Sequence, residues 1–130
     1  MSYKLFIDDI RDAPAEDWIV ARSSREANDI INENGCPLVI SFDHDLGGDD
    51  IAMRVVNHLI NKSLNDDDFF PEDFIFFVHS SNPVGAENIS ESLKNFITRY
   101  LDRPYTHMPI RVINGEQETY LGDKTETKEK

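Results

Sequence analysis

The sequence has a single cysteine, Cys36, and lacks an apolar run of the roughly 18 residues that a membrane-spanning helix requires. An internal disulfide is therefore excluded. Basic residues are also few, because 13 Lys and Arg stand against 25 Asp and Glu, for a formal net charge of -12. The first residues, MSYKLFIDDIRD, lack the basic and apolar regions of a secretory signal. We therefore expect a cytoplasmic protein with no membrane partner and no broad nucleic-acid-binding surface, since its average charge repels phosphate.

The length of 130 residues fits one domain, long enough to bury a core but too short for two. The last nine residues, GDKTETKEK, contain no apolar side chain that could anchor them to a core. We therefore divide the chain into an α/β domain at residues 1–115 and a polar C-terminal tail at residues 116–130.

Short apolar runs alternate with segments of helical periodicity, a pattern typical of a layered α/β domain with a mainly parallel sheet. The apolar runs extend over Lys4 to Ile7, Trp18 to Ala21, Leu38 to Phe42, Phe74 to Val78 and Ile110 to Ile113. Helical periodicity is found from Ser23, in a capping box with Glu26, to Gly35, from Asp49 or Asp50 to Ser63, and from Ala86 to Leu101. Only about ten residues separate the first two runs, fewer than a usual parallel crossover. We therefore expect either a reduced first helix of a single turn in this connection or a second run that lies elsewhere in the fold.

Acidic residues follow two of the predicted strands. In an open parallel sheet the carboxyl ends of the strands face one edge, and ligands bind where the strand order reverses. With the order 2-1-3-4-5, Asp8 and Asp9 after the first strand should lie near Asp43 and Asp45 after the third. Carboxylates at such range resist joint ionisation, so either some of them hold protons or a cation neutralises them, and a divalent cation is the simpler expectation. Carboxylate oxygens suit Mg or Mn. The alternative is that these acids only form turns and helix caps.

Two histidines accompany these acids. His44 lies between Asp43 and Asp45, and His79 ends the apolar run Phe74 to Val78 at the predicted ligand edge. Imidazole keeps Zn or Fe as alternative metals, and its ordinary pKa near 6.5 allows proton transfer at neutral pH. A satisfied structural histidine is the alternative interpretation of His79.

Four further side chains near this edge are candidates for binding phosphate. Arg11 and Arg22 follow the first two strands, while Ser80 and Asn82 follow the fourth. Arginine pairs well with phosphate oxygens, although solvated ion pairing is the commoner role of a single arginine. Ser80 and Asn82 can orient His79 or donate to an anion, and the alternative for Asn82 is a turn before the next helix.

Three motifs, FIDD followed by Arg11, SFDHDLG and HSSNPVG, occur in order along the chain. On these motifs, between about Lys4 and Ile113, the sequence resembles the receiver superfamily of response regulators. It is most similar to the divergent branch of cyclic-phosphate-processing receiver domains. The resemblance implies a three-layer, receiver-like (flavodoxin-like) fold with a mainly parallel five-stranded sheet. It also implies metal-binding acids, added histidines and an activity on cyclic phosphates of nucleotides or RNA ends. The segment IRVINGE has no lysine where the fifth strand of ordinary receivers supplies one.

The leading hypothesis is a metal-dependent cyclic phosphodiesterase or phosphohydrolase. In this hypothesis Asp8, Asp9 and Asp43, with Asp45 as a further candidate, hold the ion, and His79 or His44 moves protons. The partner would be a small phosphorylated ligand or an RNA end, and the sequence specifies no oligomeric state. The alternative is a non-enzymatic receiver-like module, which either accepts a phosphoryl group on Asp43 or sequesters a cyclic nucleotide without cleaving it.

Overall fold

The computed structural model describes residues 2–80, 82–103, 111–114 and 117–120. The elements in chain order are β1 (Lys4–Ile7), β2 (Trp18–Ala21), α1 (Ser24–Asn34), β3 (Val39–Phe42), α2 (Met53–Leu64), β4 (Ile75–Val78), α3 (Pro83–Asn95), a π-helical turn (Phe96–Tyr100), β5 (Arg111–Asn114) and β6 (Gln117–Tyr120). None of the helices in these residues is long and apolar enough to cross a membrane.

The strands form one six-stranded sheet in the order β2-β1-β3-β4-β5-β6. The pairs from β2 to β5 are parallel, and β6 is antiparallel to β5. The predicted α/β class with its parallel strands is confirmed. Strand β6 was not predicted, and it lies inside the segment that was predicted to be a polar tail. The rest of that tail, residues 116 and 121–130, lies outside the described residues.

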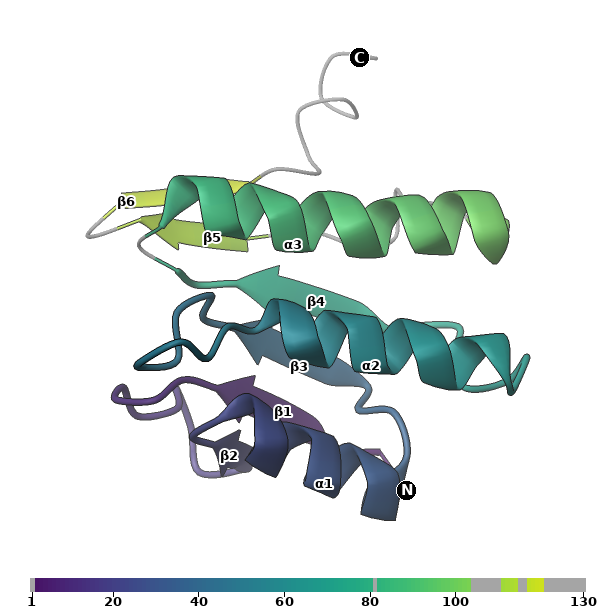
Figure 1. The fold of residues 1–130 in the computed structure, drawn as a ribbon, viewed down its shortest axis with the longest axis horizontal. Helices are drawn as coiled ribbons and strands as arrows, with labels where there is room; N and C mark the ends of the chain where they lie inside the picture. The colour runs from purple at the N-terminus through teal and green to yellow at the C-terminus, as the bar shows by residue number, and fades with distance from the viewer. Residues whose placement is uncertain (1, 81, 104–110, 115–116, 121–130) are drawn as a thin grey trace.

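The helices α1, α2 and α3 all lie on the same face of the sheet, side by side (Figure 1). The prediction of three layers is therefore wrong for the described residues, which form two layers. Right-handed crossovers explain the arrangement, because β2 to β3, β3 to β4 and β4 to β5 all advance in one direction along the sheet. The step from β1 to β2 runs the other way and would place a helix on the opposite face. Residues 8–17 contain turns, bends and irregular backbone but no helix, so the expected reduced helix is absent from this connection.

The core lies between the sheet and the three helices. The central strands contribute six helix-facing side chains that are fully buried: Leu5, Ile7, Ile40, Phe42, Phe76 and Val78. Burial of each such side chain stabilises the fold by about 1.5 to 3 kcal/mol. Because side chains alternate along a strand, Phe6 and Ser41 project from the opposite face. They are nevertheless buried, with 5% and 6% of their surfaces exposed.

The helix ends show how the sequence sets the local structure. The hydroxyl of Ser23 accepts from the amide of Glu26 at 3.0 Å, and Gly35 ends α1 with a φ of 86°, as predicted. Asp50, in contrast, does not cap α2. Its carboxylate accepts from the amide of Ser24 at 2.8 Å and from the Ser24 hydroxyl at 2.6 Å, so Asp50 binds the beginning of α1 instead. Helix α3 begins three residues earlier than predicted, at Pro83, and its first turn therefore reaches the carboxyl edge.

Candidate functional site

Three carboxylates meet at the carboxyl edge of β1 and β3. Asp8, Asp9 and Asp43 each offer an oxygen, and these oxygens lie within 4.8 Å of one another. The strands β1 and β3 are neighbours in the sheet, and the amide of Asp43 extends their pairing by donating to the carbonyl of Ile7 at 2.9 Å. The parallel register therefore fixes the level at which the acids leave the sheet.

Asp8 is the buried member of this group, with 1% of its surface exposed. Its Oδ1 accepts from the amides of Ile10 and Arg11 at 2.9 and 2.8 Å, and its Oδ2 accepts from Nε2 of His79 at 2.9 Å. Burial opposes ionisation, but the hydrogen bonds from these amides and from His79 outweigh it, so the pKa of Asp8 lies below its ordinary value. A carboxylate has about four lone-pair sites, so these contacts leave about one, on Oδ2.

The pKa of Asp43 is shifted in the opposite direction, upward from its ordinary value. Burial of this carboxyl and the negative charge of Asp8 raise its pKa to about 6, with Asp9 and Asp45 adding to the rise and Arg11 opposing it. The chain therefore holds Asp43 at a position where a second negative charge is unfavourable. Repulsion of this kind is relieved either by a proton or by a cation.

Asp9 is half-buried, and the loop after β3 passes close to it. A Cβ atom added at Gly47 would lie 3.3 Å from Oδ2 of Asp9, and the φ of Gly47 is +94°. Glycine is the residue that combines this backbone angle with so close an approach. Gly47 therefore serves the geometry of the acidic group.

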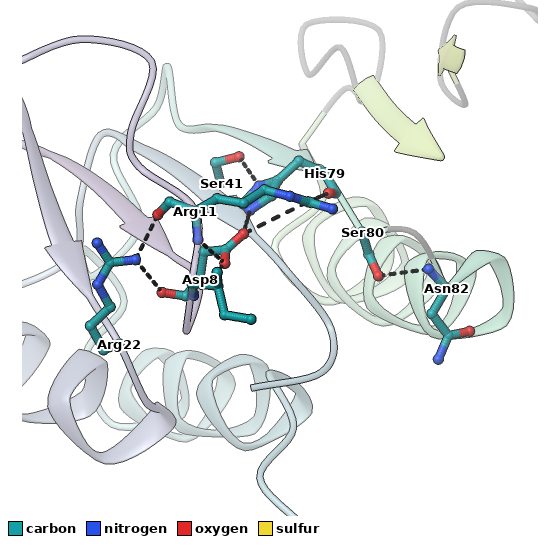
Figure 2. Close-up of polar contacts among 8 residues, drawn as sticks. Asp8, Arg11, Arg22, Ser41, His79, Ser80 and Asn82 are labelled. Carbon is teal, nitrogen blue, oxygen red and sulfur yellow. Dashed lines mark hydrogen bonds and ion pairs between the residues drawn. The ribbon is translucent and has the colours of Figure 1, made fainter. Parts of the chain in front are cut away.

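His79 is buried, and both of its ring nitrogens are engaged. Nε2 lies 2.9 Å from Oδ2 of Asp8, and Nδ1 lies 2.7 Å from the hydroxyl of Ser41 (Figure 2). The ring stacks on Phe6, with centroids 4.5 Å apart and planes 4° from parallel. Burial lowers the pKa of His79 and Arg11 adds to this effect, whereas Asp8 opposes it. Neither Ser41 nor Phe6 was predicted, although a serine inside the apolar run VISF was an available signal.

His44 lies in the loop after β3, where it is half-buried against the first turn of α3. Its Nδ1 is 3.1 Å from Oδ1 of Asp45, and its Nε2 has no hydrogen-bond partner among the described residues. The ring packs directly against Gly85, where a Cβ atom would collide with Cγ of His44. Gly85 therefore makes the space that His44 occupies. This role was not predicted from the sequence, because a glycine in the first turn of a helix has no distinctive pattern.

Asp45 does not join the group formed by Asp8, Asp9 and Asp43. Its side chain is exposed, and Oδ2 accepts from Nδ2 of Asn82 at 3.2 Å. Oδ1 of Asn82 accepts from the amide of Gly85 at 3.0 Å and so caps α3. Ser80 is buried, and its hydroxyl accepts from the amide of Asn82 at 3.0 Å. These contacts connect the loop after β3 to the beginning of α3.

Arg11 and Arg22 both lie beside the acidic group and donate to backbone carbonyls there (Figure 2). Nη1 of Arg11 donates to the carbonyl of His79 at 2.9 Å and lies 3.8 Å from Oδ2 of Asp8. Nη1 of Arg22 donates to the carbonyls of Asp8 and Arg11 at 3.1 and 2.6 Å. These bonds hold the helix-free connection after β1 in place. A guanidinium has five N–H groups, so both side chains keep donors beyond these contacts.

The donor atoms of the acidic group fit a hard cation. In the described residues, the group that could hold an ion consists of carboxylates alone, without thiolate or imidazole. Oxygen donors of this kind suit Mg or Mn rather than Zn or Fe, which favour nitrogen or sulfur ligands. His44 and His79 belong to the surroundings of this group.

Residues 3–95 match the family model described as "Cyclic-phosphate processing Receiver domain". The matched segment includes β1 to β4, the helices α1 to α3 and every side chain of the site described above. No curated protein and no solved structure matches the chain significantly.

Proposed function

The chain belongs to the family of cyclic-phosphate processing receiver domains, and from this premise we propose that it is a metal-dependent phosphoesterase acting on cyclic phosphates of nucleotides or RNA ends. The observation that carries the proposal is the approach of three carboxylates, Asp8, Asp9 and Asp43, within 4.8 Å. These residues would hold a divalent cation, Mg or Mn. Such an ion supplies polarisation of a phosphoryl oxygen and a lowered pKa of bound water.

The two histidines take different roles in this proposal. His44 is the proton donor or acceptor, because its Nε2 is free of partners among the described residues. His79 orients Asp8, because Nε2 is occupied by that carboxylate and Nδ1 by Ser41. Arg11 and Arg22 hold the loop of Asp8 and Asp9, and their remaining N–H groups are available to a phosphate.

The test is a panel of 2',3'- and 3',5'-cyclic nucleotides, and RNA ending in a cyclic phosphate, incubated with Mg or Mn. We expect turnover of at least one member by the wild type and its loss in Asp43→Asn and His44→Ala. Asp73→Asn is the matched control, since it removes the same charge from an exposed position before β4, at the opposite edge of the sheet. Absence of turnover for every substrate with either ion would contradict the proposal.

A second candidate is a module that binds a cyclic nucleotide without cleaving it. The observation that favours it is the engagement of both ring nitrogens of His79, which leaves His44 as the single free imidazole among the site residues described above. A nucleotide that raises the melting temperature and is recovered intact would support this candidate. A phosphoacceptor role for Asp43 is tested by incubation with a small phosphodonor and Mg, where an unchanged intact mass would contradict it.

A further inference from the structure

Ser41 has a contact that neither the fold nor the acidic group explains. It lies in the middle of β3, and its hydroxyl is 2.7 Å from Nδ1 of His79 while Nε2 of the same ring is 2.9 Å from Oδ2 of Asp8. The hydroxyl, the imidazole and the carboxylate therefore form a continuous chain of hydrogen bonds. All three residues are buried, with 6%, 5% and 1% of their surfaces exposed.

The positions of the hydrogen atoms in this chain follow from the donors and acceptors. Oδ1 of Asp8 already accepts two backbone amides, so Asp8 acts as an acceptor and Nε2 of His79 carries the hydrogen of their bond. If Nδ1 also carried a hydrogen, the Ser41 hydroxyl would accept it and would need another acceptor for its own. No other side-chain or backbone acceptor for this hydroxyl is found among the described residues. The hydroxyl therefore donates to Nδ1.

We propose that Ser41 is a positioning residue for Asp8, because its hydroxyl fixes the ring of His79 with the hydrogen on Nε2 and so directs that N–H to Oδ2 of Asp8. The stacked ring of Phe6 fixes the plane in which this hydrogen bond forms. The result is a carboxylate that can neither rotate nor swap its oxygens, with one lone-pair site left on Oδ2. The effect of Ser41 on ion binding rests on the proposed function, whereas the position of the hydrogen on the His79 ring does not.

The experiment compares wild type with Ser41→Ala, Ser41→Thr and Ser90→Ala. Threonine keeps the hydroxyl and suits a strand. Ser90 is a matched control, because it is another buried serine, 2% exposed, whose hydroxyl donates to the carbonyl of Ala86 within α3. Long-range ¹H–¹⁵N spectra of the metal-free proteins report which ring nitrogen of His79 carries hydrogen, with His79→Asn used for assignment. Titration with Mn²⁺ alone then gives the dissociation constant.

In wild type, Ser41→Thr and Ser90→Ala we expect His79 to carry hydrogen on Nε2 and to accept a hydrogen bond at Nδ1. In Ser41→Ala the signal of His79 Nδ1 should move toward that of a ring nitrogen that accepts no hydrogen bond. Loss of a residue that orients a metal ligand directly weakens binding about 10- to 100-fold, so one contact further out we expect about 3- to 10-fold weaker Mn²⁺ binding. Thermal unfolding shows whether each variant is folded at the temperature of the titration.

Three outcomes would overturn the proposal. The first is a wild-type His79 with hydrogen on Nδ1. The second is an Nδ1 signal and a Mn²⁺ affinity unchanged by Ser41→Ala. The third is an equal loss of affinity in Ser90→Ala, which would show a general effect of removing a buried hydroxyl. If wild type binds no Mn²⁺ at all, the proposed function fails instead, and the metal-free spectra still decide the hydrogen bond between Ser41 and His79.

Discussion

Replacing Asp43 by Asn should stabilise the metal-free protein, although it removes a residue of the proposed site. Burial and the charge of Asp8 raise the pKa of Asp43 from 3.8 to about 6 in the folded chain. A carboxyl whose folded pKa exceeds its unfolded pKa favours folding below the unfolded value. This contribution to stability is lost as the pH rises through the pKa of the folded state. Above about pH 6 the ionised Asp43 therefore opposes folding, and the neutral amide of Asn does not.

The size of the effect follows from that pKa. A rise from 3.8 to about 6 corresponds to about 3 kcal/mol at about 1.36 kcal/mol per pKa unit. Asp43 is only half-buried, so solvent screening reduces the expected gain to about 1 to 2 kcal/mol. For a domain of this size that is about 4 to 7 °C in melting temperature. The measurement is thermal unfolding in EDTA at pH 7.5 and at steps down to about pH 4, where the difference from wild type should become small.

Binding of a divalent ion should reverse the order of stability of wild type and Asp43→Asn. Mn²⁺ at about 100 times its dissociation constant stabilises a binding protein by about 2.7 kcal/mol, so wild type should gain melting temperature and Asp43→Asn should not. Asp73→Asn, an exposed acid away from the group, should change little in either condition. If Asp43→Asn is less stable than wild type in EDTA at pH 7.5, the three carboxylates do not repel one another as argued, and the reasoning is refuted.

Three further predictions concern the surroundings of these acids. Gly85→Ala should lower turnover more than tenfold while leaving Mn²⁺ affinity unchanged, because the new methyl group displaces His44. Steady-state kinetics and Mn²⁺ titration measure the two effects. Equal losses of turnover and of Mn²⁺ affinity would contradict this prediction. Asp8→Asn should lower the free energy of unfolding at neutral pH by about 2 kcal/mol or more, since the carboxylate is buried and hydrogen-bonded. Its pKa is depressed in the folded state, so urea unfolding should show the loss shrinking as the pH falls below about 4. Arg22→Ala should cost about 1 to 2 kcal/mol and speed hydrogen exchange at the Arg11 amide, whereas unchanged exchange would show that this arginine does not hold the loop.

The meeting of Asp8, Asp9 and Asp43 was predictable because it depends on a general property of parallel sheets. Every strand delivers its carboxyl end to one edge, so the strand order alone places the residues after β1 and β3 together. The predicted residues around them, in contrast, have different contacts from those expected. Asp45 and Asn82 form a hydrogen bond with each other. This contact was not predictable, because it depends on where α3 begins and not on a local sequence pattern.

Side-chain direction is what the sequence could not supply. Ser41 is a single polar residue in an apolar strand, and only its position opposite Phe77 in the sheet, two residues before the level of His79, brings it to that ring. Asp50 was expected to cap the helix that follows it and instead binds the beginning of α1, 26 residues away. The absence of a second helical layer was indicated more clearly by the sequence, since the connection between β1 and β2 is too short for a full helical crossover.

The sheet face that carries Phe6, opposite the helices, also carries the sole tryptophan of the chain, Trp18 on strand β2, because Trp18 pairs with Lys4 and side chains alternate along a strand. Its indole lies edge-on to Phe6 with ring centroids 6.0 Å apart, and Phe6 stacks on His79 at 4.5 Å. Nζ of Lys4 lies 5.4 Å from the centre of the indole ring. The tryptophan fluorescence of the protein therefore originates one aromatic ring away from the imidazole that orients Asp8, so it provides an optical reporter of the surroundings of Asp8 that needs no added label.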